Sequence, residues 1–252
     1  MILDQVIRAT AGRVAGLPGT EEYDIAPVRS AISLSSALGQ KQGNRIIAEI
    51  KFASPSRGTI RQRSDPVTFA RDFCRAGAAA LSVLTEPVYF QGDPGFLPAI
   101  RPHVDIPLLR KDFIIDERQL AESRALGADA VLLIAGVLGE GLHDMVDLAQ
   151  AYGLEPLVEV HSADEVKTAL STQTRIVGIN NRDLRTMKTD LSTTIRLAPL
   201  LRNAGIRIVS ESGVVWPCDI RTLRRFADGF LIGTALMSSP DPLQRLEGFL
   251  SA

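Results

Sequence analysis

The chain has 252 residues, of which 45% are hydrophobic and 23% are charged, and its formal net charge is −1. This length suits one large α/β domain built around a single core. The balanced charge excludes a general electrostatic attraction to nucleic acid or to an acidic membrane, and the most apolar stretch, residues 128–138, is too short to cross a bilayer.

The first 43 residues form an extension that lies outside the repeating pattern of the rest. Ile2, Val6, Ala9 and Arg13 have the spacing of one face of a short amphipathic helix. A stretch broken by Gly and Pro follows, and then a segment rich in Ser and Ala at residues 30–38. We expect this extension to plug one end of the following domain or to cover its mouth. The chain begins without the basic start and apolar run of a secretion signal, so we expect a cytoplasmic protein.

From residue 44 onward, short β-branched apolar runs alternate with helical patterns, which is typical of βα units and a parallel sheet. Eight such units match the closure of a TIM barrel, so we predict an α/β fold, a (β/α)8 barrel over 44–252, with residues 1–43 as an N-terminal helical extension and 1–252 as a single domain. An open doubly wound sheet would carry a Gly-rich loop after its first strand, where this chain reads SPSRG. The predicted strands are residues 45–51, 79–86, 107–113, 128–135, 155–161, 176–181, 207–212 and 229–234.

Capping residues support the helices between these strands. Asp65 and Pro66 open a helix that ends before Gly77. Asp116 begins another, which ends before Gly127.

Charged and amide side chains interrupt five of the eight apolar strands near their carboxyl ends. Because side chains on a strand alternate between two faces, each falls in line with inward-facing apolar residues. A TIM barrel builds its active site at this end. The residues are Glu49, Lys51, Lys111, Glu159, Asn180, Arg182 and Glu211.

These charges have either a structural or a functional explanation. Lys51, Lys111 and Arg182 offset the carboxylates in sign, so a polar cluster can persist without substrate. A purely stabilising ring of ion pairs is the structural alternative. Charges on five strand ends favour the functional one, since isolated buried charges are costly.

A phosphate site is predicted after the last two strands. Ser212 and Gly213 end one strand, Gly233 and Thr234 end the next, and the loops at these positions of a TIM barrel often bind phosphate. Glycine allows the backbone to approach the phosphate closely. Ser54, after the first strand, adds a hydroxyl group.

Other candidate residues carry a weaker signal. Tyr89, Phe90, Phe113 and Leu184 follow strand ends and are candidates for an apolar pocket. We interpret His161 as a structural hydrogen-bonding residue. The two cysteines and three histidines are dispersed, so we expect no metal site.

Several long motifs identify a family. The chain is similar to indole-3-glycerol phosphate synthase in the order and spacing of its strand and loop motifs over roughly residues 44–238. The motifs are IIAEIKFASPSRG, LSVLTEPVYFQG, LLRKDFIID, GADAVLLI, LVEVH, VGINNRDL, VSESGV and FLIGTALM.

This resemblance implies conversion of 1-(2-carboxyphenylamino)-1-deoxyribulose 5-phosphate to indole-3-glycerol phosphate, with loss of carbon dioxide and water and without metal or organic cofactor. It implies that Lys111 is the general acid of ring closure and that Glu159 and Lys51 share the later proton transfers. Glu49, Asn180 and Glu211 would orient these groups and the substrate hydroxyls.

The resemblance also implies substrate contacts. Arg182 and Lys51 would meet the substrate carboxylate, and Phe90, Phe113 and Leu184 would line the pocket. The phosphate would be held by Ser54, Ser212, Gly213, Gly233 and Thr234.

The extension departs from the family pattern, because Tyr23 is the only aromatic residue in 1–43. The part that the extension plays in substrate capture therefore stays open.

Two other readings remain at this point. One is a different phosphate-binding barrel enzyme, either an isomerase of tryptophan biosynthesis or a Schiff-base aldolase. The other is a non-catalytic descendant, in which a strand-end charge should be missing.

The expected partner is a phosphorylated small molecule, and neither nucleic acid nor membrane is expected to bind. The sequence makes no prediction about protein partners.

Overall fold

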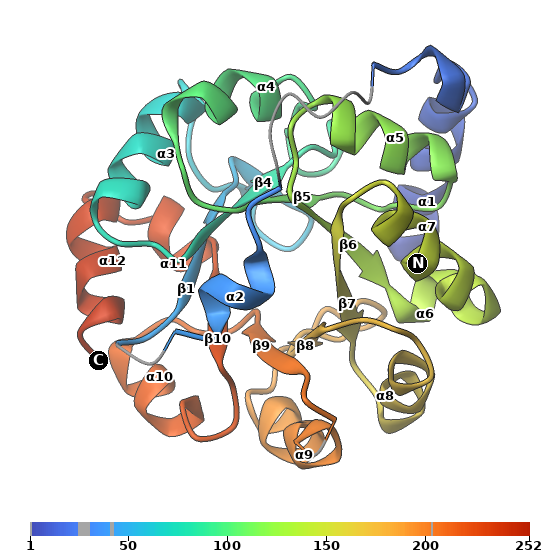
Figure 1. Ribbon diagram of the computed structural model, residues 1–252. Coiled ribbons are helices and arrows are strands. Elements are labelled where there is room, and N and C mark those ends of the chain that lie inside the picture. Colours follow the sequence, from blue (N-terminus) through green and yellow to red (C-terminus); the bar gives the residue numbers. More distant parts are fainter. Residues whose placement is uncertain (1, 25–30, 41–42, 203) are drawn as a thin grey trace.

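The computed structural model describes residues 2–24, 31–40, 43–202 and 204–252 (Figure 1). A closed barrel of parallel strands forms its centre, and each strand pairs with the next in sequence until the last pairs with the first. The predicted (β/α)8 fold is therefore confirmed. The barrel strands are β1 (Ile46–Ile50), β4 (Ala80–Leu84), β5 (Leu108–Lys111), β6 (Ala130–Ile134), β7 (Glu155–Val160), β8 (Ile176–Asn180), β9 (Arg207–Glu211) and β10 (Gly229–Ile232). A small hairpin of β2 (Ala53–Ser54) and β3 (Gly58–Thr59) follows β1.

Helices surround the barrel, and each strand is followed by at least one (Figure 1). The barrel helices are α3 (Pro66–Arg75), α4 (Phe96–Ile100), α5 (Glu117–Ala125), α6 (Ala135–Leu138), α7 (Leu142–Ala151), α8 (Ala163–Leu170), α9 (Ser192–Leu201), α10 (Pro217–Leu223), α11 (Thr234–Met237) and α12 (Pro242–Leu250). Short 3-10 turns lie at η2 (Arg101–His103) and η3 (Gly139–Gly141). The predicted caps are present, since Asp65 accepts hydrogen bonds at the start of α3 and Asp116 at the start of α5.

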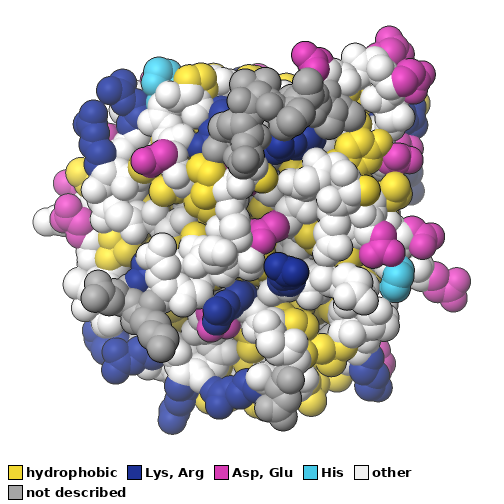
Figure 2. Space-filling model, in the orientation of Figure 1, with side chains coloured by type: hydrophobic (Ala, Val, Ile, Leu, Met, Phe, Trp, Pro, Cys, Tyr) yellow, Lys and Arg dark blue, Asp and Glu magenta, His cyan; other side chains and the backbone are white. Residues whose placement is uncertain are grey.

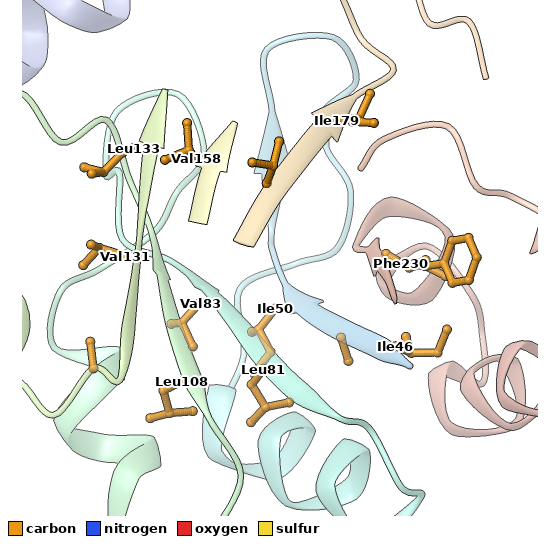
Figure 3. Packing of buried hydrophobic residues seen from close by; sticks show 14 of the residues in the cluster. Ile46, Ile50, Leu81, Val83, Leu108, Val131, Leu133, Val158, Ile179 and Phe230 are labelled. Carbon is orange, nitrogen blue, oxygen red and sulfur yellow. The ribbon is translucent and has the colours of Figure 1, made fainter. Parts of the chain in front are cut away.

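The apolar core has two layers. One lies between the strands and the helices, where Figure 3 shows Leu81 of β4 and Phe230 of β10 beside the surrounding helices. The other fills the barrel interior with side chains such as Ile47, Leu109 and Leu157. Strands buried on both faces explain why the sequence shows continuous apolar runs.

The extension forms α1 (Ile2–Val14), η1 (Thr20–Glu22) and α2 (Leu34–Leu38). Leu34 and Leu38 of α2 are buried against interior residues at the amino-terminal end of the strands, and Figure 1 shows α2 in front of the ring. Polar contacts fix this plug, because Ile32 N donates to Asp129 Oδ1 (2.8 Å) and Ser35 N to Glu155 Oε2 (2.9 Å). The expectation that the extension plugs one end of the barrel is thus met. Residues 25–30 of the expected loop, with Ser30, lie outside the described residues.

Helix α1 lies along the outside of the barrel and contacts the other end of a strand. Arg13 forms two hydrogen bonds to Asp112, at 2.9 and 2.7 Å, directly after β5. No described residue of the extension lines the cavity at the carboxyl end of the barrel. Acidic and basic side chains both reach the surface on the plugged face (Figure 2). Among the described residues, no helix combines the length and the apolar character needed to span a bilayer.

Candidate active site

A cavity of about 1200 Å³, including solvent at its mouth, opens at the carboxyl ends of the strands. Apart from the candidate Tyr89, every site residue predicted from the sequence lines it, although the predicted positions are spread over most of the chain. These residues are Glu49, Lys51, Ser54, Phe90, Lys111, Phe113, Glu159, Asn180, Arg182, Leu184, Glu211, Ser212, Gly213, Gly233 and Thr234. The barrel closure brings them together, because it gathers all strand ends around one axis.

Lys111 lies at the centre of the polar floor. It is the last residue of β5, and its Nζ donates to Glu159 Oε2 and to Glu211 Oε2, both at 3.0 Å. The three groups come from β5, β7 and β9. All three side chains are largely buried, so their charges interact with little screening by water.

The pKa values of this cluster are shifted. Burial alone would lower the pKa of Lys111, but attraction to Glu159, Glu211 and Glu49 outweighs burial and raises it above its ordinary value. Burial raises the pKa of Glu211 to about 7, against the attraction of Lys111. Lys111 therefore carries its proton at neutral pH, while Glu211 is near the midpoint of its titration.

A second ion pair and an amide complete the floor. Lys51 Nζ lies 2.5 Å from Glu49 Oε1. Asn180 Nδ2 donates to Glu159 Oε1 (2.9 Å), so Glu159 is held by Asn180 on one oxygen and by Lys111 on the other. His161 Nδ1 lies 2.7 Å from Asn180 O, which agrees with a structural role for His161.

Arg182 was expected to offset the carboxylates in sign, and Glu49 attracts it. Among the described residues, however, no carboxylate forms a direct ion pair with it, and its Nη1 donates to Met187 O (3.2 Å). The reason is that β8 ends at Asn180, so Arg182 lies in a loop. Burial, and then repulsion from Arg57, lowers the pKa of Arg182. Two neighbouring cations at the cavity wall leave positive charge for an anionic ligand.

The loop after β9 has an unusual backbone. Ser212 has φ +60° and Gly213 has φ +89°, so two consecutive residues lie in the left-handed region. Within the described residues, the N–H groups of Gly213 and of Thr234, which follow the paired strands β9 and β10, donate to no acceptor. Unused backbone donors on two adjacent strand ends are suited to bind phosphate oxygens.

Gly233 is required for a reason that differs from the expected one. Its φ is −117°, an ordinary value, but a Cβ placed there would lie 2.0 Å from Glu49 Oε1. A side chain at 233 would therefore displace Glu49 as well as obstruct a phosphate. Ser54 is buried at the cavity edge, with its Oγ 3.5 Å from Ser56 Oγ.

An aromatic pair forms the apolar wall. The ring centroids of Phe90 and Phe113 lie 6.1 Å apart, and Leu184 also lines the cavity, whereas Tyr89 does not. A buried carboxylate positions Phe90, because Glu86 accepts hydrogen bonds from the N–H groups of Val88, Tyr89 and Phe90. This apolar wall faces the charged floor across the cavity.

Sequence reasoning missed three residues at this site. Arg57 lines the cavity, and its position in the SPSRG loop beside Ser54 was the available signal. Glu86 ends a predicted strand, and this position was the available signal for it. Asn181 follows Asn180 and points to the other face of β8, where it bonds to Ser210. Among the described residues, no group of three or more His, Cys, Asp or Glu side chains is arranged to hold a metal ion.

Comparisons with known proteins agree with this geometry. The family model for indole-3-glycerol phosphate synthase matches residues 11–249. The indole-3-glycerol phosphate synthase of Carboxydothermus hydrogenoformans is 47% identical over 226 residues, covering 89% of this chain and 84% of the relative. That of Methanopyrus kandleri is 39% identical over 253 residues, covering 99% and 98%. The tryptophan synthase alpha chain of Legionella pneumophila shares the fold, with a TM-score of 0.63 and 14% identity over 86% of this chain and 94% of that one.

Proposed function

Because the chain belongs to the indole-3-glycerol phosphate synthase family, we propose specific roles for its cavity residues in the reaction of that family. The chain is a carboxy-lyase of tryptophan biosynthesis. It closes the pyrrole ring of 1-(2-carboxyphenylamino)-1-deoxyribulose 5-phosphate and releases carbon dioxide and water to give indole-3-glycerol phosphate.

Lys111 is the general acid of ring closure. In this step the ring carbon that bears the carboxylate attacks the ketone carbon, and the carbonyl electrons move to oxygen. An alkoxide is a stronger base than an amine, so proton transfer from the Lys111 ammonium is favourable even though its pKa is raised. The observation that carries this role is the placement of Lys111 Nζ between Glu159 and Glu211, which holds the proton at one point of the cavity.

Glu159 and Lys51 share the proton transfers that follow. When carbon dioxide leaves, the electrons of the broken bond restore the aromatic ring, and no proton is needed. Loss of water then requires one group to protonate the departing hydroxyl and another to take a proton from the neighbouring carbon. Glu159 and Lys51 both line the cavity, and Asn180 and Glu49 hold them there.

The remaining lining residues bind the two anionic groups and the aromatic ring of the substrate. Arg182 and Lys51 bind the carboxylate, and Arg57 adds positive charge beside Arg182. Phe90, Phe113 and Leu184 pack against the anthranilate ring. The phosphate is bound by Ser54, Ser212, Gly213, Gly233 and Thr234.

The family match disfavours the isomerase, and the site disfavours the aldolase and the non-catalytic descendant. A Schiff-base aldolase needs a lysine whose pKa is lowered so that the neutral amine can attack a carbonyl, whereas the pKa of Lys111 is raised. A non-catalytic descendant would lack a charge at a strand end, whereas each predicted one lines the cavity.

The substrate is a free small molecule, and we place the reaction in the cytoplasm. The two cysteines are free thiols, as is usual in that reducing compartment.

The decisive experiment incubates the purified chain with the carboxyphenylamino-deoxyribulose phosphate and follows indole absorbance. Lys111→Met, checked for its fold by circular dichroism, is the matched control. Indole formation by the wild type and its loss in the variant support the assignment. Equal rates in both proteins would remove Lys111 from the chemistry.

A further inference from the structure

Asn181 lies beside the catalytic cluster but faces away from it. It follows Asn180 at the end of β8, is fully buried, and extends toward β9 and α9. Its Oδ1 accepts hydrogen bonds from the N–H (3.0 Å) and Oγ1 (2.9 Å) of Thr194, in the first turn of α9. The side chain is therefore anchored from the helix side.

The amide nitrogen of Asn181 holds the end of β9. Its Nδ2 donates to Ser210 Oγ, Glu211 O and Ser212 O, each at 3.0 Å. The two carbonyl groups belong to consecutive residues at the point where the chain leaves the strand. One buried side chain thus fixes two successive peptide groups, whereas a single hydrogen bond would fix only one.

Those peptide groups lead into the left-handed segment. Ser212 has φ +60°, a conformation that an L-residue other than glycine adopts at a cost in energy. Such a conformation persists only where surrounding contacts fix it. The bonds from Asn181 to the carbonyl groups on either side of the Ser212 φ rotation are contacts of this kind.

The same loop is supported from behind. A Cβ on Gly213 would lie 2.6 Å from Thr189 Cγ2, so Gly213 packs closely against the segment that follows β8. The backbone of Asn181 also holds that segment, since its main-chain oxygen accepts a hydrogen bond from Asp190 N (2.9 Å). Asn181 therefore connects both sides of the loop that carries Ser212 and Gly213.

We propose that Asn181 is a positioning residue for phosphate binding, which acts by holding Ser212 and Gly213 in the left-handed conformation that presents their backbone to the ligand. The proposal rests on the proposed function only in that it takes these two residues as part of the phosphate site. Asn181 lies behind this loop and does not line the cavity. Its loss should weaken ground-state and transition-state binding of the phosphate about equally, because the phosphate is remote from the reacting carbons.

The test compares Asn181→Ala with Thr194→Val, using inorganic phosphate as the probe. Thr194→Val removes the two hydrogen bonds of the Thr194 hydroxyl, to Asn181 Oδ1 and to Ser210 Oγ, from the same buried network. It leaves the bonds from Asn181 to Glu211 O and Ser212 O in place. For Asn181→Ala we expect KM of the substrate and the inhibition constant of phosphate to rise together by about tenfold or more, with kcat within about threefold of wild type. For Thr194→Val we expect both constants to stay within about twofold.

A rescue experiment separates positioning from general stability. Glycine adopts positive φ without strain, so Ser212→Gly added to Asn181→Ala should recover at least part of the phosphate affinity. If Asn181→Ala does not fold, Asn181→Leu keeps the side-chain volume, removes the side-chain hydrogen bonds without burying a charge, and is read by the same criteria.

Two failures are distinguishable. If phosphate does not compete with substrate in the wild type, the proposed phosphate site is wrong. If it does compete, and a folded Asn181 variant keeps the wild-type inhibition constant while only its melting temperature falls, Asn181 is merely structural and this inference is overturned.

Discussion

Lys111 Nζ lies 3.0 Å from Glu211 Oε2, yet burial raises the pKa of this glutamate from its ordinary 4.5 to about 7 despite the pairing. The attraction of the lysine lowers the pKa, but the larger effect of burial raises it. Near neutral pH the contact thus alternates between a charged and a neutral carboxyl. The lysine keeps its proton in both states.

The first prediction is a pH dependence of kcat/KM set by Glu211. The ionised carboxylate orients the ammonium of Lys111, so kcat/KM should fall as pH decreases below about 7. In Glu211→Gln, kcat/KM should be lower overall and should lack this ionisation. The second ionisation of the substrate phosphate, with a pKa of about 6, remains with both proteins and serves as an internal reference.

Stability gives an independent check of the same group. Because the pKa of Glu211 is raised in the folded state, the folded protein binds the proton more tightly, and the stabilisation is complete below 4.5 and is lost as pH rises to about 7. The unfolding free energy of the wild type relative to Glu211→Gln should therefore decrease over this window, by up to about 3 kcal/mol. A relative free energy that is flat from pH 4 to 8 would contradict the assigned pKa.

Lys111 is predicted to be essential as a proton donor. Lys111→Met should lower kcat by at least about 100-fold, the lower end of general acid contributions. Lys111→Arg is the matched control, since it keeps the positive charge between Glu159 and Glu211 but holds its proton too tightly to donate it. Single-turnover rates at saturating substrate measure both. A methionine variant with more than about a tenth of wild-type kcat would exclude the role.

Gly233 is predicted to couple phosphate binding to the catalytic floor. A methyl group there would meet Glu49 Oε1, which holds Lys51. Gly233→Ala should therefore raise KM and also lower kcat, rather than affect KM alone. Steady-state kinetics with phosphate inhibition check this, with Gly248→Ala in α12 as the control, because nothing lies within 4 Å of a Cβ added there. An unchanged kcat in a folded variant would mean that Glu49 moves aside without consequence.

Arg13 is predicted to fasten α1 to the barrel. Arg13→Met removes two hydrogen bonds from buried Asp112, while Arg110 and Thr85 still contact that carboxylate. We expect a loss of about 1–3 kcal/mol in the unfolding free energy, measured by urea denaturation. Arg13→Lys should recover only part of it, because an ammonium group does not bind both oxygens in the same way. A loss below about 0.5 kcal/mol would show that α1 is held by its apolar contacts alone.

The sequence predicted the barrel and its lining residues because both depend on simple periodicity. In a closed parallel barrel, a charge in an apolar strand and in line with its inward face can only lie in the cavity, so Glu49, Lys111, Glu159 and Glu211 were all identifiable. The rule does not give the partner of a side chain beyond the strand end. Arg182 follows β8 and lines the cavity, but its side chain bonds to a loop carbonyl instead of to a carboxylate.

Residues that act through backbone contacts could not be found in this way. Glu86 and Asn181 bind N–H or carbonyl groups of loops whose conformation no sequence pattern specifies. The positive φ of Ser212 was equally hidden, because serine gives no signal for it. A local sequence pattern indicates which face of a strand a residue occupies, but its hydrogen-bond partners depend on tertiary contacts.

The plug formed by α2 has a consequence for the order of assembly during synthesis. The segment leaves the ribosome early, yet its polar partners Asp129 and Glu155 are made roughly a hundred residues later. At a synthesis rate of about 5–20 residues per second, the nascent segment waits on the order of 5–20 seconds before its polar partners exist. Its two leucines must remain unburied or transiently covered during that interval. This early segment therefore cannot complete its polar contacts until β7, the fifth strand of the barrel, has been made.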